Sequence, residues 1–209
     1  LQCTSLTHID IPSSITKIES KTFEGCTSLK EIIIPSLVTE IKYKAFSNCS
    51  NLTQITIPSS VTKIESCAFI QCSSLVKIVL PSLVEMIEPK TFYMCKSLEE
   101  ITIHSPIKRI GYSAFKHCTS LKQFTLPSTI NEIERKVFHG CESLKEIVIP
   151  STVTRIGYKA FDSCTSLEKI SILSELTHIY DYAFSRCSSL QQITIPSSVF
   201  TIGQGAFKD

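Results

Sequence analysis

A spacing of 23 residues, repeated along the whole chain without one insertion, is the feature that most limits how this sequence can fold. Nine cysteines keep it from Cys3, nine leucines from Leu6 and nine isoleucines from Ile18, together with nine phenylalanines. The phenylalanines are Phe23, Phe46, Phe69, Phe92, Phe115, Phe138, Phe161, Phe184 and Phe207. A fixed period of about 20 to 50 residues is typical of solenoids, in which one supersecondary unit stacks on its copies. The sequence therefore predicts nine copies of a single unit.

Each unit reads C-x-x-L-x-x-I-x-I-P-x-x-V-x-x-I-x-x-x-A-F-x-x. The alternation in Ile55-Thr56-Ile57 has the period of two that a strand shows, with two side chains inward and one outward. A proline follows this segment in seven units, where its missing N–H ends the ladder of hydrogen bonds. The proline positions are Pro12, Pro35, Pro58, Pro81, Pro127, Pro150 and Pro196, with His104 and Leu173 in the other two units. A second short extended segment, such as 61–64, then leads into a tight turn at the Ala-Phe pair.

These features predict a β-rich solenoid with little helix, in which nine coils stack and a parallel sheet lines the concave face. Parallel crossover connections are right-handed almost without exception, so we expect a right-handed coil. We interpret residues 1–209 as one domain, and since the chain starts at Leu1 inside the repeat pattern, as a piece of a longer protein. The units begin near Cys3, Cys26, Cys49, Cys72, Cys95, Cys118, Cys141, Cys164 and Cys187.

The repeat resembles a known class of leucine-rich repeat. Segment 6–11 reads L-x-x-I-x-I, which is similar to the leucine-rich repeat strand, and the following Pro, V-x-x-I and A-F-x-x-C elements resemble the BspA-like, treponemal-type class over essentially the whole chain. The resemblance implies a non-catalytic protein-binding or adhesion module of the kind found on bacterial surfaces and in parasitic protozoa. Unlike ordinary leucine-rich repeats, the unit lacks the asparagine after the strand.

Composition and motifs narrow the function classes. The net charge is +2, and no basic run exceeds Lys108-Arg109, so we expect no nucleic acid partner. The sequence contains no stretch of about 18 apolar residues, so we predict no membrane span. No nucleophile, phosphate-loop or zinc motif occurs, so we predict no enzyme activity, cofactor or metal. The five histidines scatter over different repeat positions and are expected on the surface: His8, His104, His117, His139 and His178.

The cysteines occupy one repeat position, so they form a ladder rather than a set of disulfide pairs. Parallel Cβ vectors disfavour bridging between neighbouring coils, and we predict buried free thiols that pack as small apolar groups. Cys67 is the exception, because it stands where other units carry lysine, as at Lys44 and Lys90. We therefore expect Cys67 to lie on the surface, where it either has drifted without consequence or is open to oxidation.

Two surfaces are candidates for binding. The strand face is the first, although its β-branched residues also suit strands without any ligand. Its central outward residues are Asp10, Ile33, Thr56, Val79, Thr102, Thr125, Val148, Ser171 and Thr194. Beside them run His8, Glu31, Gln54, Lys77, Glu100, Gln123, Glu146, Lys169 and Gln192. The second is an aromatic patch in which repeat spacing makes Tyr158, Tyr180 and Tyr182 neighbours, with Phe200 nearby.

Two asparagines fit the glycosylation pattern N-x-S/T, Asn48 and Asn51. Serine dominates the position of Asn51 in other units, so we expect the Asn51 side chain to bond at a turn and to be poorly exposed. Modification at either site depends on secretion, which the sequence leaves open.

We predict a module that binds a protein or an extended polymer through its strand face. The alternatives are an intracellular scaffold or regulatory segment of a multidomain protein, and a structural repeat that assembles end to end. Neither end of the sequence shows the polar residues of a capping unit, and an uncapped end favours end-to-end contact. Free thiols favour the cytoplasm and the family resemblance favours the cell surface, so the compartment stays open.

Overall fold

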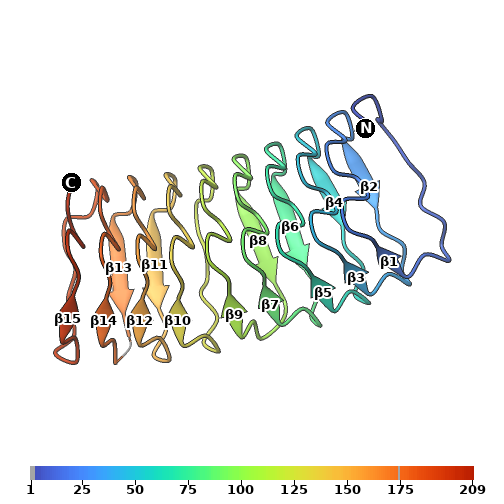
Figure 1. The fold of residues 1–209 in the computed structure, drawn as a ribbon. Helices are drawn as coiled ribbons and strands as arrows, with labels where there is room; N and C mark the ends of the chain where they lie inside the picture. Colours follow the sequence, from blue (N-terminus) through green and yellow to red (C-terminus); the bar gives the residue numbers. More distant parts are fainter. Residues whose placement is uncertain (1–2, 174) are drawn as a thin grey trace.

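The chain forms one row of coils that run side by side from the N-terminus to the C-terminus (Figure 1). The structure is a computed structural model that describes residues 3–173 and 175–209. No helix occurs in these residues, and the strands that pair are parallel throughout. The two ends of the chain lie at opposite ends of the row (Figure 1). The predicted β-solenoid is therefore confirmed.

Each coil contributes to one or both of two rows of strands. The first row follows the I-x-I segment and comprises β2 (Glu31–Ile33), β4 (Gln54–Thr56), β6 (Lys77–Leu80), β8 (Glu100–Ile103), β11 (Glu146–Ile149) and β13 (Lys169–Ile172). The second row comprises β1 (Lys17–Ile18), β3 (Glu40–Ile41), β5 (Lys63–Ile64), β7 (Met86–Ile87), β9 (Arg109–Ile110), β10 (Glu132–Ile133), β12 (Arg155–Ile156), β14 (His178–Ile179) and β15 (Thr201–Ile202). Isolated bridges from Gln123 to Glu146 and from Lys169 to Gln192 continue the first row.

The sequence period sets the pairing register. Ile32 lies opposite Ile55, and Ile78 lies opposite Ile101, so every strand residue meets its own copy 23 residues along the chain. The same rule stacks the phenylalanine rings, whose centroids lie 5.2 to 5.7 Å apart in eight successive pairs. Eight pairs correspond to about eight full turns. No coil can bury these side chains alone, so stability comes from contact between neighbours.

Phe124 locally alters this pattern. It fills the inward strand position that isoleucine holds in most coils, and its ring packs 5.0 Å from the rings of both Phe115 and Phe138. The larger ring takes up more width than isoleucine, and the segment around it keeps only the bridge at Gln123 in place of a strand. The first row has no named strand between β8 and β11, but it is also unpaired between β4 and β6 and keeps only a bridge at Gln192, so this interruption is not peculiar to Phe124.

The turn after the second strand is built from left-handed backbone. One position per coil has a φ of 55° to 62°, and its residues are Lys21, Lys44, Cys67, Lys90, Ser113, Lys136, Lys159, Tyr182 and, as the glycine, Gly205. A second position lies four residues later, as at Gly25 and Asn48. Backbone N–H groups in this turn donate to the next coil, as from Lys21 to the Tyr43 carbonyl at 3.0 Å and from Phe23 to the Ala45 carbonyl at 2.8 Å. These bonds join residue i to i+22, one residue short of the strand register.

The cysteine ladder lies inside the solenoid, with an exception at its first member. Cys26 through Cys187 are buried and free, whereas Cys3 is exposed. The Cys49 thiol donates to the Phe23 carbonyl at 3.1 Å, and the buried cysteines that follow repeat this bond at 3.1 to 3.2 Å. Burial raises the pKa of Cys49 to about 12. The buried thiols are therefore neutral at physiological pH.

The expectation that Cys67 lies on the surface is wrong. Its side chain is buried, and burial raises the pKa of its thiol. The backbone at this repeat position is left-handed whichever residue it carries, with φ of 61° at Cys67 and 57° at Lys90. A long lysine can reach solvent from this position, whereas a short thiol stays beneath its neighbours.

Candidate functional site

The strand face presents the outward side chains of the first row, in register from coil to coil. In β2, β4 and β6 the burial alternates, so that Ile33, Thr56 and Val79 point to solvent while the flanking isoleucines point inward. Ile33 is 74% exposed, the highest value among the large apolar side chains of the described residues. Val79 and Val148 are about half exposed. Apolar side chains are thus displayed at intervals along a polar surface.

The charged residues beside this line pair with one another across coils. Lys77 Nζ lies 2.9 Å from a carboxylate oxygen of Glu100, and the Gln54 amide donates to Glu31 at 2.8 Å. The contact with Glu100 raises the pKa of Lys77. Glu146 and Lys169 face each other in the register of β11 and β13. The strand face is therefore polar with much of its charge compensated from within.

Three hollows lie along this face. The first, of about 470 Å³, is lined by residues from Asp10 to Thr56. The second and third, of about 500 and 530 Å³, share Gln123, Phe124 and Thr125 in their lining, so they adjoin where the first row of strands is interrupted. Cavities of about 300 to 1,000 Å³ are the size that ligand groups occupy. Predicted strand-face residues from Asp10 to Lys169 line these hollows, with Lys77 and Val79 between the first and the second.

The predicted aromatic patch separates into two small clusters. The rings of Tyr158 and Tyr182 meet edge to face with centroids 6.2 Å apart. Tyr180 instead stacks on His178, whose ring also contacts Phe200 at 4.6 Å between centroids. The patch is therefore divided between the left-handed turn and the second row of strands.

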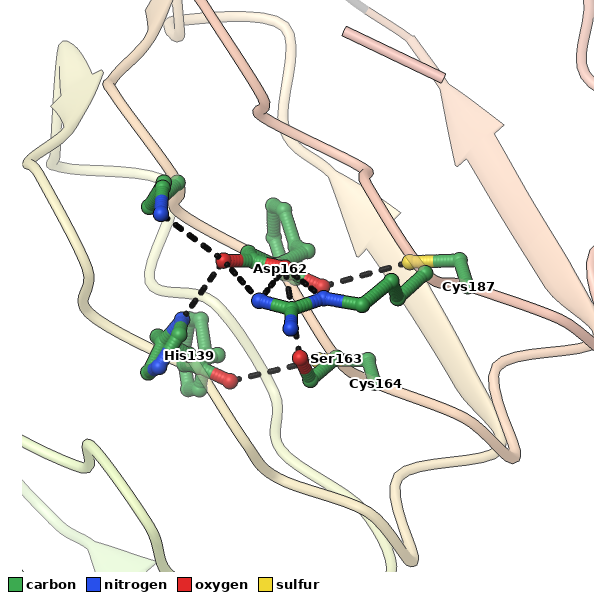
Figure 2. Close-up of polar contacts among 9 residues, drawn as sticks. His139, Asp162, Ser163, Cys164 and Cys187 are labelled. Carbon is green, nitrogen blue, oxygen red and sulfur yellow. Dashed lines mark hydrogen bonds and ion pairs between the residues drawn. The ribbon is translucent and has the colours of Figure 1, made fainter. Parts of the chain in front are cut away.

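A buried ion cluster that our sequence reasoning missed lies beside the same turn. Asp162 is fully buried and accepts hydrogen bonds from the Arg186 guanidinium at 2.9 to 3.1 Å, while Lys159 Nζ lies 3.6 Å away (Figure 2). His139 Nδ1 lies 3.1 Å from the second carboxylate oxygen but not at a hydrogen-bonding angle. Ser163 Oγ adds a contact of 3.2 Å.

His139 is consequently no surface residue, contrary to our expectation. Burial lowers its pKa to about 4, with Lys116 and His117 adding to the shift and Asp162 opposing it. The signal was available in the sequence, because His139 and Asp162 occupy one repeat position in adjacent coils. Arg186 and Lys159, which come from two other repeat positions, compensate the charge of Asp162, and none of the cluster's residues lines a hollow of the strand face.

The sequence matches the family model described as "BspA type Leucine rich repeat region (6 copies)" over residues 1–122 and 108–209. The chain belongs to the BspA-type leucine-rich repeat family. The family resemblance that we inferred from the repeat motifs is confirmed. No curated protein matches the chain significantly.

Solved structures of other leucine-rich repeat proteins are similar to this chain. A leucine-rich repeat protein from Bacteroides ovatus is 32% identical with a TM-score of 0.89, over 99% of this chain and 53% of that one. The T. pallidum leucine-rich repeat protein is 27% identical with a TM-score of 0.58, over 87% and 77%. A leucine-rich cell surface protein from Faecalibacterium prausnitzii is 28% identical with a TM-score of 0.56, over 97% and 70%. The chain thus spans about half the length of the B. ovatus protein.

The asparagines of the glycosylation pattern lie differently from our expectation. Asn51 is exposed, whereas the serines at its repeat position, such as Ser28 and Ser74, are half-buried. Asn48 has a left-handed backbone and its amide donates to Ser47 Oγ at 3.0 Å. The prediction that Asn51 is poorly exposed is therefore wrong.

Neither a metal site nor a membrane-spanning helix is found among the residues that the structure describes. Within residues 3–173 and 175–209, no group of three or more His, Cys, Asp or Glu side chains is placed to hold a metal ion. Over the same residues, no helix has the length and hydropathy needed to cross a membrane. The repeat family is generally non-catalytic, which agrees with the lack of a catalytic motif.

Proposed function

We propose that this BspA-type module is a non-catalytic binding protein whose strand face holds an extended segment of a protein ligand. The observation that carries the proposal is the line of hollows over the first row of strands, from which exposed Ile33 and Val148 project. Apolar anchors within a polar surface are the usual arrangement of a protein interface. An extended peptide has a repeat of about 3.3 Å per residue and can follow such a line over several coils.

Similarity to a cell surface protein supports a surface location and an adhesion role. The free thiols argue less strongly for the cytoplasm than their number suggests. Eight of the nine ladder cysteines are buried and donate to carbonyls or pack in the core, and burial raises the pKa of Cys49, Cys187 and their neighbours. Such thiols are shielded from oxidation in either compartment.

The proposal is tested with a library of random peptides displayed on phage, from which binders to the chain are selected. The test variant carries Ile33→Lys and Val79→Lys. Its matched control carries Leu37→Lys and Leu83→Lys, which replace exposed leucines in the same two coils that lie outside the first row of strands. We expect the selected peptides to lose about tenfold or more in affinity for the test variant alone. Equal loss with both variants, or selective loss with Tyr158→Ala and Tyr182→Ala, would contradict the assignment.

A second candidate is end-to-end self-association. Ile202 is 52% exposed at the last coil, while its copy Ile179 is fully buried. Phe207 is 39% exposed, while Phe184 is 1% exposed. An apolar coil end with an unpaired strand favours contact with a second end. We expect light scattering to show a mass that rises with concentration and returns to that of a monomer with Ile202→Lys; a constant monomeric mass would exclude this candidate.

A further inference from the structure

A hollow of about 460 Å³ opens on the left-handed turns, away from the strand face. Nine residues line it, and they come from three repeat positions in a staggered three-by-three grid. The columns are Ile70, Tyr93 and Lys116; Lys90, Ser113 and Lys136; and Tyr112, Arg135 and Tyr158. Ser113 lies at the middle of this grid and is a small, buried residue at a position where both neighbouring coils carry lysine.

The grid is held by backbone bonds between coils. The N–H of Lys90 donates to the Tyr112 carbonyl at 3.2 Å, Ser113 donates to Arg135 at 3.1 Å, and Lys136 donates to Tyr158 at 2.9 Å. The offset of 22 residues in these bonds brings the three columns together. The repeat therefore sets the backbone positions of the lining residues, and the hollow does not need a ligand in order to form.

The lining carries four positive charges, on Lys90, Lys116, Arg135 and Lys136, and no carboxylate. Among the residues that the structure describes, none of these four groups lies within ion-pair distance of an acidic side chain. Burial lowers the pKa of Lys116, and Lys136, Lys159 and Lys90 add to the effect, while Asp162 opposes it. A cluster of this kind is favourable for an anion that brings several negative charges at once.

The tyrosine rings orient the cations. Arg135 lies 4.6 Å from the centroid of the Tyr112 ring, and Lys90 lies 5.9 Å from the same ring. Lys116 lies 5.8 Å from the Tyr93 ring, and Lys136 lies 5.5 Å from the Tyr158 ring. Since a cation already lies over each ring, a nucleic acid base could not stack on that face of the ring without displacing it. Their hydroxyl groups are left to hydrogen-bond with a polar ligand.

The choice of cations narrows the ligand class further. Three of the four are lysines, which act as mobile point charges, whereas planar bidentate recognition of a single phosphate group favours arginine. The hollow spans three coils and has the volume of a small ligand site. Spaced monoanionic groups on a hydroxyl-rich chain fit this arrangement better than one compact dianion does.

We propose that the hollow between Lys90, Lys116, Arg135 and Lys136 binds a multiply sulfated oligosaccharide. Sulfate groups supply the spaced charges, and the sugar hydroxyls and ring oxygens pair with the tyrosine hydroxyls. The site is independent of the strand face, so it stands or falls separately from the function proposed above.

The test measures fluorescence anisotropy of a labelled, fully sulfated heparin hexasaccharide with the whole chain, at low and at physiological salt. The site variant carries Lys90→Gln and Lys136→Gln. Glutamine suits the left-handed position, which a neighbouring left-handed residue, Gln71, shows with a φ of 61°. The matched control carries Lys30→Gln and Lys145→Gln, two exposed lysines just before the first row of strands. Both variants remove two positive charges.

We expect the site variant to bind the sulfated hexasaccharide about tenfold or more weakly and the control to change by less than about twofold. The desulfated hexasaccharide is expected to show no binding, and a single-stranded DNA of equal charge is expected to bind at least about tenfold more weakly than the sulfated sugar. Equal weakening in the two variants would reduce the effect to net charge and overturn the site. Tighter binding of the DNA would overturn the ligand class, and no binding at low salt would overturn both. Thermal melting of each variant checks that the turn is intact.

Discussion

The strand face and the basic hollow on the turns are built from the same repeat but differ in whether their charges are paired. On the strand face, one column mixes two lysines with glutamates and glutamines, and opposite charges meet across coils, as at Lys77 and Glu100. On the turn face, the lysine column runs beside tyrosines, and Lys90 and Lys136 meet no acid among the described residues. In a solenoid, the residue one period away in the neighbouring coil thus decides whether a charge is paired. We therefore expect binding on the strand face to depend on shape and apolar anchors, and binding in the basic hollow to depend on electrostatics.

The largest expected difference between the faces is in thiol reactivity. Cys67 belongs to the turn column and is buried, so it should react with a thiol reagent only when the turn opens, on the order of a thousandfold or more slower than exposed Cys3. Thr56→Cys on the strand face is the matched comparison and should react at the rate of Cys3. Stopped-flow titration followed by mass spectrometry identifies the modified residues. A fast Cys67 would show that the turn face is open.

The second largest difference between the faces is expected in stability, at the buried ion cluster of Asp162. Arg186→Ala leaves the carboxylate of Asp162 buried with weaker pairing, and we expect a loss of about 3 kcal/mol in the free energy of unfolding. Asp162→Ser should cost less, because Arg186 is 56% exposed at its side chain and can be solvated. The double variant should resemble Asp162→Ser. Urea denaturation measures all three.

Arg155→Ala is the control for this experiment, since its partner Glu132 is exposed and lies 3.8 Å away. We expect almost no loss there. If Asp162→Ser proved more damaging than Arg186→Ala, the cluster would be a net source of stability rather than a buried charge that needs a partner.

His139 gives the turn face a dependence on pH below neutrality. Its pKa is about 4 in the folded chain and near the ordinary value of about 6.5 when unfolded, so the unfolded state binds more protons between these values. The free energy of unfolding should therefore fall as the pH decreases from about 6.5 to about 4. His139→Gln should flatten this part of the profile, measured by thermal melting across the range, whereas His8→Gln should leave it unchanged. An unchanged profile in His139→Gln would contradict the assignment.

The smallest effect is expected on the strand face itself. Lys77 and Glu100 are both exposed, so the ion pair between them is screened by water. Lys77→Gln should shift the melting temperature by less than about 2 °C. A larger shift in differential scanning calorimetry would show that the strand face also depends on its charges for stability.

Much of the fold could be predicted because the period fixes it. The strands at Ile55 and Ile64, the phenylalanine stack and the buried thiols all follow from one residue meeting its own copy. Residues that depart from the repeat pattern were harder to place. Cys67 was misplaced because lysine at its position was taken as a sign of solvation, whereas a long lysine reaches solvent from a position at which a short thiol stays buried.

The candidate sites show the same division. The outward residues of the strand face follow from alternation within each strand. The basic hollow does not follow from it, because the turn pairs residue i with i+22, which places Lys90 beside Tyr112 rather than only beside Ser113. The packing of Phe124 between Phe115 and Phe138 depends on ring volume within a packed core, which spacing alone does not contain.

The coil-to-coil bonding also determines how the molecule would respond to tension along its long axis. Since each coil is held to its neighbour by its own bonds, a pull on the two ends loads the interfaces in series, and they yield one at a time from an end. Each coil that detaches releases 23 residues of chain, a length of about 75 Å when extended, in place of a stacked height near 5 Å. A module built in this way lengthens in equal steps under load while the coils that have not yet detached keep their two faces intact.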